Sequence, residues 1–196
     1  MKTVKMVVTG PFNAGKTAFI RTISEIEVVS TEKKVSSQAE KIKESTTVAM
    51  DFGRITIDDG LVLNIFGTPG QKRFNFMWEI LAEGMVGFVV MVDSTKPETF
   101  REARLMLEAF QTFAPAPFIV VANKQDCEEA WSLEDIRNVL KLGSDVKFLP
   151  CIATNFDSVR TVVLELLSKI MTELDKGTVE VIVRKNSRQS FIAENS

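Results

Sequence analysis

"VVTGPFNAGKTAF", residues 7–19, joins an apolar, strand-like run to a helical pattern through a short polar stretch. Gly10, Gly15, Lys16 and Thr17 match the pattern G-x-x-x-x-G-K-[ST]. Glycines let backbone N–H groups curve around a polyphosphate, and the helix that follows presents its amino-terminal end to the negative charge. Lys16 adds a point charge at the terminal phosphates, and the Thr17 hydroxyl is a ligand for Mg²⁺. The stretch therefore predicts a phosphate-binding loop between a strand and a helix.

Strand and helix signals alternate along the rest of the chain. Strand-like runs cover residues 4–9, 48–57, 61–66, 85–92, 118–122 and 146–150, and helical patterns begin near Lys16, Glu98, Leu133 and Ser158. For the helix that begins near Leu133, Ser132 is the expected cap and Gly143 the expected stop. The turn at 58–60 predicts a hairpin, so the second and third strands should be antiparallel, whereas helices separate the others and make them parallel. We therefore expect an α/β fold of the P-loop NTPase type. Its mostly parallel six-stranded sheet would have one antiparallel strand and helices on both faces.

Composition limits the classes of function. The 196 residues are 45% hydrophobic, which suits one domain, and we expect it to span 1–176, with a strand-like extension and tail at 177–196. A net charge of -2 argues against a nucleic-acid partner, and the absence of histidine excludes histidine bases and histidine zinc sites. Two separated cysteines, Cys127 and Cys151, fit free thiols in a reducing, cytoplasmic location, with a single disulfide as the alternative. With no signal peptide, spanning segment or lipidation site visible, we expect no stable membrane anchor.

A second motif follows the apolar run at 118–122. In "NKQD", residues 123–126, the Asp126 carboxylate is suited to accept two hydrogen bonds from N1–H and the 2-amino group of guanine, which adenine does not offer. The Lys124 stem would pack on the ring face, and Asn123 would brace the phosphate loop. Taken alone, "NKQD" is equally consistent with a polar turn. Its position after the strand favours a base-reading site.

Together these motifs resemble those of Ras-like small GTPases over roughly residues 3–176. "GPFNAGKT" matches the first guanine-nucleotide motif, "NKQD" the fourth, and the polar stretch ending in "TTVAMDFG" and the segment "FGTPGQKRF" resemble the two switches. "CIATN" lies where the fifth motif is expected, so the N–H of Ala153 would meet guanine O6. The resemblance implies nucleotide contacts from Asn13, Ala14, Gly15, Lys16, Thr17, Ala18, Gly70, Asn123, Lys124, Asp126 and Ala153. It implies catalytic roles for Gln71 and Lys16, and metal binding by Thr17 and Thr47.

The chain departs from the family pattern in three motifs. The acid that opens the second switch is replaced by Gly67, so metal binding would depend on Thr17, Thr47 and the phosphates. Asp51 and Asp93 are alternative sources of an acid that the sequence alone does not place. Phe12 stands where Ras proteins have glycine, and its ring would obstruct an arginine inserted by an activating partner. Ile152 and Thr154 replace the usual serine and lysine of the fifth motif, which weakens the base pocket.

The predicted activity is that of a regulatory GTPase, with Mg²⁺ as cofactor and GTP or GDP as ligand. Hydrolysis would be slow, with Arg73 and Arg54 as internal arginine candidates. One alternative is a nucleotide-dependent binding module with little hydrolysis, and another is a kinase acting on a small molecule, for which no lid or acceptor pocket is visible. The switch residues most resemble prokaryotic small GTPases of the gliding-motility type, which implies effector, exchange or activating partners, including roadblock-domain proteins. A monomer or a nucleotide-dependent dimer is expected.

Two surface features have alternative interpretations. Phe74, Phe76, Met77 and Trp78 form either a partner-binding surface or a helix packed on the sheet. The basic residues of the tail, Arg184, Lys185 and Arg188, either contact anionic lipid weakly or are solvated.

Overall fold

The computed structural model describes residues 2–30, 50–58, 60–70 and 74–175. Its strands are β1 (Lys2–Thr9), β2 (Val29–Ser30), β3 (Asp51–Asp58), β4 (Leu61–Gly67), β5 (Met85–Asp93), β6 (Phe118–Asn123) and β7 (Phe148–Cys151). Its α-helices are α1 (Lys16–Ile23), α2 (Phe76–Ala82), α3 (Phe100–Phe113), α4 (Leu133–Leu140) and α5 (Phe156–Asp175), and the 3-10 helix η3 (Pro97–Thr99) precedes α3.

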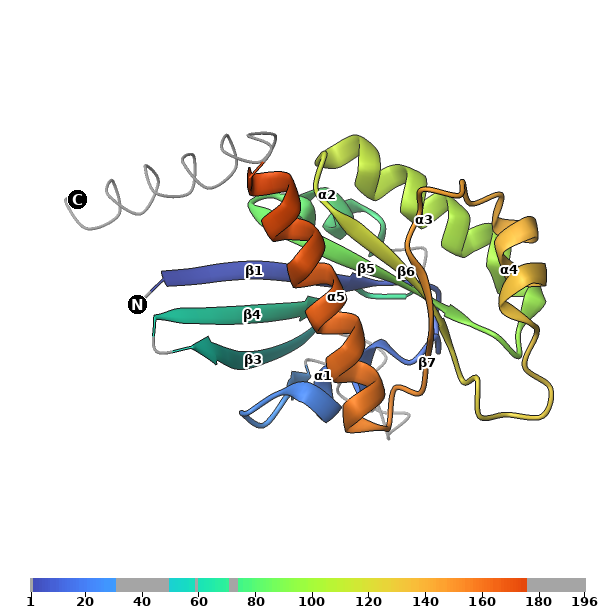
Figure 1. The fold of residues 1–196 in the computed structure, drawn as a ribbon, viewed down its shortest axis with the longest axis horizontal. Coiled ribbons are helices and arrows are strands. Elements are labelled where there is room, and N and C mark those ends of the chain that lie inside the picture. Colours follow the sequence, from blue (N-terminus) through green and yellow to red (C-terminus); the bar gives the residue numbers. More distant parts are fainter. Residues whose placement is uncertain (1, 31–49, 59, 71–73, 176–196) are drawn as a thin grey trace, which may run out of the picture.

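The strands form one twisted sheet in the order β2-β3-β4-β1-β5-β6-β7 (Figure 1). Strand β1 pairs in parallel with β4 and β5, and β5, β6 and β7 continue in parallel. Strand β3 runs antiparallel to β4 through the turn that Gly60 closes by donating its N–H to Asp58 Oδ1 at 2.9 Å. The predicted fold class is confirmed, with six strands of four or more residues, of which β3 is the antiparallel one. The two-residue β2, which pairs with β3 as the outermost strand, was not predicted.

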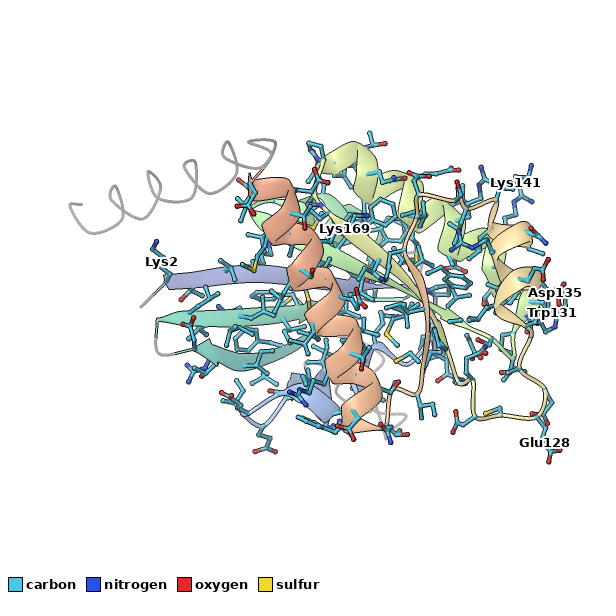
Figure 2. The ribbon with its side chains drawn as sticks, in the orientation of Figure 1. Lys2, Glu128, Trp131, Asp135, Lys141 and Lys169 are labelled. Carbon is cyan, nitrogen blue, oxygen red and sulfur yellow. The ribbon has the colours of Figure 1, made fainter. Side chains whose placement is uncertain are left out.

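Helices cover both faces of the sheet, as predicted. Helices α1 and α5 pack on one face, where Phe19, Ile20, Val162 and Leu166 join a core of alternating strand residues. The other face is covered by α2, α3 and α4. Lys169 of α5 (Figure 2) donates to the Phe118 carbonyl at 3.3 Å and lies over the Phe118 ring, which ties this helix to β6.

Some helix ends differ from the sequence prediction. The α4 start is correct, because Ser132 caps it by accepting from the Asp135 N–H at 3.1 Å. This helix was expected to stop at Gly143 but ends at Leu140, since Lys141 adopts a left-handed conformation with φ 51°. Helix α5 begins at Phe156 rather than near Ser158. The predicted tail at 177–196 lies outside the described residues.

The topology decides where the motifs meet. Because β1, β4, β5, β6 and β7 are parallel, their carboxyl ends lie at the same edge of the sheet. The antiparallel β3 begins at that edge, and its first residue, Asp51, lies opposite Gly67 in the register with β4. The edge therefore gathers the phosphate loop, the start of the second switch and the "NKQD" segment.

Candidate nucleotide-binding site

The phosphate loop depends on two glycines. Gly10 has φ 148° and Gly15 has φ 102°, both in the region that favours glycine. A Cβ on Gly10 would lie 2.3 Å from the Met91 carbonyl oxygen of β5, and a Cβ on Gly15 would lie 2.1 Å from the Asn123 side-chain nitrogen. Helix α1 starts immediately after Gly15, and no side chain caps its first N–H groups. The loop therefore lies tightly against the sheet and presents helical N–H groups to an anion.

Lys16 is buried inside this loop. It is 7% exposed, and its Nζ donates to the carbonyl oxygens of Gly10 and Pro11, each at 2.7 Å. The ammonium group also lies near Gly70, where an added Cβ would come within 2.9 Å of Nζ. The second-switch glycine is thus next to the loop lysine, as a contact of both residues with a terminal phosphate requires.

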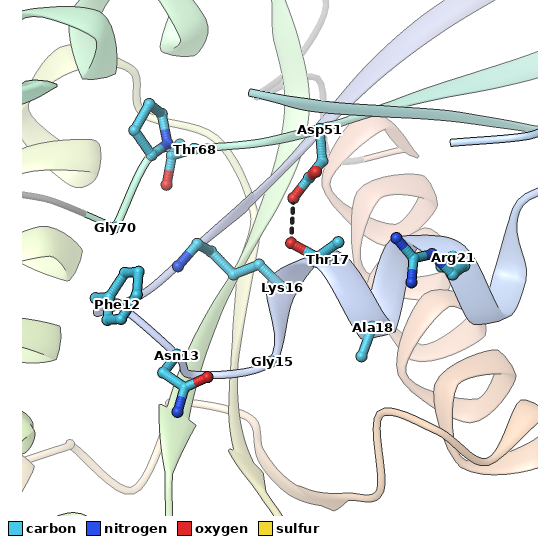
Figure 3. Close-up of a pocket in the computed structure, with 11 residues that line it drawn as sticks. Phe12, Asn13, Gly15, Lys16, Thr17, Ala18, Arg21, Asp51, Thr68 and Gly70 are labelled. Atoms are coloured by element: carbon cyan, nitrogen blue, oxygen red, sulfur yellow. Dashed lines mark hydrogen bonds between the residues drawn. The ribbon is translucent and has the colours of Figure 1, made fainter. Parts of the chain in front are cut away.

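A pocket of about 360 Å³ opens beside the loop (Figure 3). Its lining residues come from the loop, α1, β3 and the segment after β4: Phe12, Asn13, Gly15, Lys16, Thr17, Ala18, Arg21, Asp51, Thr68, Pro69 and Gly70. The predicted phosphate-side residues are therefore brought together, with Phe12 at 62% exposure on the surface. Ala14 is buried beneath the loop.

One side chain in the pocket changes the expectation for Gly67. Asp51 is 8% exposed, and its Oδ2 accepts a hydrogen bond from the Thr17 hydroxyl at 2.5 Å (Figure 3). A Cβ built on Gly67 would lie 3.4 Å from the same carboxylate oxygen. A carboxylate therefore stands beside position 67 although Gly67 has no side chain. Of the two acids that the sequence left unplaced, the structure puts Asp51 in the pocket lining.

Asn123 connects the loop to the base-reading segment. Its side-chain nitrogen donates to the Ala14 carbonyl at 2.9 Å, which is the brace predicted from the sequence. Its side-chain oxygen accepts from the Ala153 N–H at 2.9 Å. The expected contact of this N–H with guanine O6 stays a prediction, and the structure shows that the Ala153 N–H lies within reach of Asn123.

Lys124 and Asp93 form an ion pair next to this brace. The Lys124 Nζ lies 2.5 Å from Asp93 Oδ2, and Asp93 is 2% exposed. Burial by itself raises the pKa of Asp93, but hydrogen bonds from Lys124 and Thr95 outweigh it and leave this pKa below its ordinary value. Asp93 thus holds the ammonium group of Lys124, whose aliphatic part was expected to pack on the base. The exposed Asp126 carboxylate has no hydrogen bond or ion pair within the described residues.

Other predicted residues have different outcomes. Thr47, Gln71 and Arg73 lie outside the described residues. Arg54 does not line the pocket, and its backbone bonds to the segment after α1 through Ser24 Oγ and the Glu25 N–H. Arg21 lines it instead. The sequence signal for Arg21 was its place one helical turn after Thr17, on the same face of α1.

The aromatic residues after the second switch divide between the two interpretations. Phe74 and Trp78 are buried at 1% and 8% exposure, so they pack in the core. Phe76 and Ile80 of α2 are exposed at 60% and 58%. Helix packing therefore accounts for one face of α2, and its other face exposes two large apolar side chains.

Comparison with known proteins places the chain in a family. A model of the family described as "Conserved hypothetical ATP binding protein" matches residues 26–191. The chain belongs to this family. An uncharacterised protein of Methanocaldococcus jannaschii is 32% identical over 125 residues, which cover 63% of this chain and 71% of that protein.

Two further relatives carry the names of small GTPases. The ADP-ribosylation factor-like protein 3 of Saccharomyces cerevisiae is 28% identical over 139 residues, 68% of this chain and 66% of that protein. The Ras-related protein SEC4 of the same yeast is 25% identical over 156 residues, 77% of this chain and 72% of that protein. The family match and these relatives together place the chain in the small GTPase-like superfamily.

The described residues lack two further features. No helix in this part of the chain is both long and apolar enough to cross a membrane. No group of three or more His, Cys, Asp or Glu side chains among these residues is arranged to hold a metal ion.

Proposed function

We propose that this chain is a guanine-nucleotide switch that binds GTP with Mg²⁺ and hydrolyses GTP slowly to GDP and phosphate. The observation that carries the proposal is the double hydrogen bond of Asn123, which joins the phosphate loop at Ala14 to the segment at Ala153. Through these two hydrogen bonds the "NKQD" segment lies next to the loop that we propose binds the phosphates. A nucleotide bound through its phosphates would then have its base near Lys124 and Asp126.

The choice of guanine rests on Asp126. The family description names ATP, but its match begins at residue 26, beyond the phosphate loop, and specifies no residue that reads a base. The Asp126 carboxylate has no partner in the described chain, and the two adjacent donors of guanine would satisfy it. Adenine has no such donor pair at that edge, so its binding would leave a carboxylate unpaired.

The residues on the phosphate side suit Mg²⁺ and phosphoryl transfer. The donor set in the pocket consists of hydroxyl and carboxylate oxygens, which Mg²⁺ prefers, and the cation usually keeps several waters and binds substrate phosphates. Thr17 and Thr47 would hold the metal, which supplies charge neutralisation on the phosphate oxygens. Lys16 would give up its hydrogen bonds to the loop carbonyls and donate to the terminal phosphates instead. Gly70 would contact the γ-phosphate through its N–H, and Gln71 would orient the attacking water.

The test of guanine recognition is competition binding with the wild type and Asp126→Asn. We expect the wild type to prefer GTP over ATP by on the order of 10⁴-fold. Asp126→Asn should lose GTP and gain xanthosine triphosphate, because its amide N–H donates to the 2-oxo group that replaces the guanine amine. Asp145→Asn, an exposed acid at a distant loop, is the matched control and should leave the preference unchanged. Wild-type binding of ATP within about tenfold of GTP would refute the base assignment.

A binding module with little hydrolysis is the second candidate. Two observations favour it: Phe12 lies exposed at the pocket, and Gly67 lacks the acid of the family pattern. A single-turnover hydrolysis assay separates the two. Slow hydrolysis that Gln71→Leu abolishes, with GTP affinity retained, supports the switch. GTP binding with negligible hydrolysis in the wild type supports the module.

The remaining expectations extend this proposal. We propose a cytoplasmic protein that works with effector, exchange or activating proteins as a monomer or nucleotide-dependent dimer. The exposed Phe76 and Ile80 of α2, next to the second switch, are suited to such partners. Affiliation with the gliding-motility type and roadblock-domain partners is proposed from the switch residues.

A further inference from the structure

We propose that Asp51 supplies, from the start of β3, the carboxylate that the second-switch motif lacks at Gly67, and that it orients the metal site. This inference rests on the proposed nucleotide function and names a residue that positions the metal ligand Thr17. It does not depend on which base the nucleotide carries.

The register of the sheet brings Asp51 to this place. Asp51 pairs with Gly67 across the antiparallel β3–β4 ladder, so the two Cα atoms are direct neighbours. A Cβ on Gly67 would approach Asp51 Cβ to 3.1 Å and Asp51 Oδ2 to 3.4 Å. The carboxylate of Asp51 therefore lies in the space that a side chain at 67 would enter. One acid fits there comfortably, and a second would crowd the first and repel its charge.

The hydrogen bond to Thr17 has the direction that a metal site needs. The Thr17 hydroxyl donates its proton to Asp51 Oδ2 at 2.5 Å, so its lone pairs remain for a cation in the pocket. A carboxylate that accepts from a ligating group fixes the orientation of that ligand and increases its basicity. Asp51 is 8% exposed and lines the same pocket as Lys16 and Gly70, so water competes weakly for this bond.

The other charged side chains that line the pocket are cationic, so they do not attract a metal ion. Lys16, with its buried ammonium group, and Arg21 line the same pocket, and both attract anions rather than cations. Asp51 is the acid among the pocket-lining residues. A divalent cation bound at Thr17 would meet this carboxylate directly or through one of the waters that Mg²⁺ retains.

The experiment measures how Mg²⁺ slows release of a fluorescent GDP analogue carrying a methylanthraniloyl group on the ribose. Release is followed over a titration of free Mg²⁺ for the wild type, Asp51→Asn and Asp58→Asn. We expect Asp51→Asn to raise the Mg²⁺ midpoint by about 10- to 100-fold, because the amide keeps an acceptor for Thr17 but loses the charge. Asp58→Asn makes the same substitution at the other end of β3, where the acid bonds Gly60, and should match the wild type.

A relocation variant keeps the test decisive if Asp51→Asn folds poorly. Asp51→Gly combined with Gly67→Asp moves the acid to the family position, where the remaining close contact is the flexible Ile20 Cδ1 at 2.8 Å. This pair should recover a Mg²⁺ midpoint closer to the wild type than Asp51→Gly alone. An unchanged midpoint in Asp51→Asn, or no recovery in the relocation variant, would overturn the role of Asp51.

Failure of the proposed guanine-nucleotide function would give a different result in this release experiment from failure of the Asp51 role. A wild type that releases the GDP analogue at once, with or without Mg²⁺, contradicts guanine recognition. The same titration with the adenine analogue then tests Asp51 by itself. A wild type whose nucleotide release ignores Mg²⁺ with either base overturns the inference.

Discussion

The side chain of Asn123 uses both ends of its amide to hold two backbone segments that are far apart in the sequence. It donates to Ala14 in the phosphate loop and accepts from Ala153 after β7. Gly15 makes this approach feasible, because any Cβ there would collide with the amide nitrogen at 2.1 Å. Position 15 therefore requires glycine because the Asn123 side chain approaches it so closely, and both residues belong to the candidate site.

Replacement of Asn123 with Ala should cost both stability and nucleotide affinity. The change leaves a buried carbonyl and a buried N–H without partners, and each such group costs about 1–3 kcal/mol. We expect the free energy of unfolding from urea titration to fall by about 2 kcal/mol or more. The matched control is Asn138→Ala on the exposed face of α4, which should have little effect. Equal losses in the two variants would contradict the bracing role of Asn123.

At the scale of elements, periodicity and turn signals predicted most of the sheet and the phosphate loop. The apolar strands, the hairpin at Asp58 and Gly60, and the Ser132 cap are local signals, and the structure has all of them. The end of α4 was wrong because the left-handed Lys141 substitutes for the expected glycine. The two-residue β2 was missed because it exists only by pairing with β3.

The acid proposed for the metal site shows why local signals were not enough. The sequence offers Asp51 and Asp93, which are chemically equal. Only the antiparallel register with Gly67 brings Asp51 to the pocket, and register is a property of paired strands rather than of one segment. Asp93 ends β5 at the same edge, but it pairs with Lys124. The distinction between a metal-site acid and an ion-pair partner therefore required the fold.

Strand β7 ends in Cys151, whose thiol should be unreactive in the folded protein. Burial, opposed by a hydrogen bond with Ser158, raises the pKa of Cys151 to about 11. Because the thiolate is the reactive form, only about 0.1% of Cys151 would be reactive at about pH 8 even if reagents could reach it. We expect a maleimide to label Cys127, which is partly exposed, and to label Cys151 only in denaturant. Mass spectrometry of Cys127→Ser checks this: fast labelling of that variant without denaturant would show that the β7 edge opens readily.

Across the whole molecule, the candidate site coincides with one edge of the sheet. Loops after β1, β4, β5, β6 and β7 meet there, and β3 begins there. Both cores, one under α1 and α5 and the other under α2, α3 and α4, lie behind that edge. A ligand bound by several of these loops contacts segments from both halves of the sheet. Its binding free energy should therefore appear as stability of the entire domain.

This coupling predicts the thermal response to nucleotide. With Mg²⁺–GDP at a concentration about 100 times its Kd, the folded state gains about 2.7 kcal/mol. For a chain of this size that gain corresponds to a rise in Tm of about 5–10 °C. In Lys16→Ala, loss of a buried charge at the phosphates should raise the Kd by about 100-fold, since a charged hydrogen bond contributes about 1.5–3 kcal/mol.

The rise in Tm for Lys16→Ala should then shrink to about 1 °C at the same concentration. Each variant is compared with its own nucleotide-free sample by scanning calorimetry, so that any intrinsic loss of stability cancels. Lys2→Ala is the matched control, because Lys2 lies exposed at the opposite end of β1 (Figure 2) and should keep the full rise in Tm. If Lys16→Ala is stabilised by nucleotide as much as the wild type, the phosphates bind elsewhere than in the loop that follows β1.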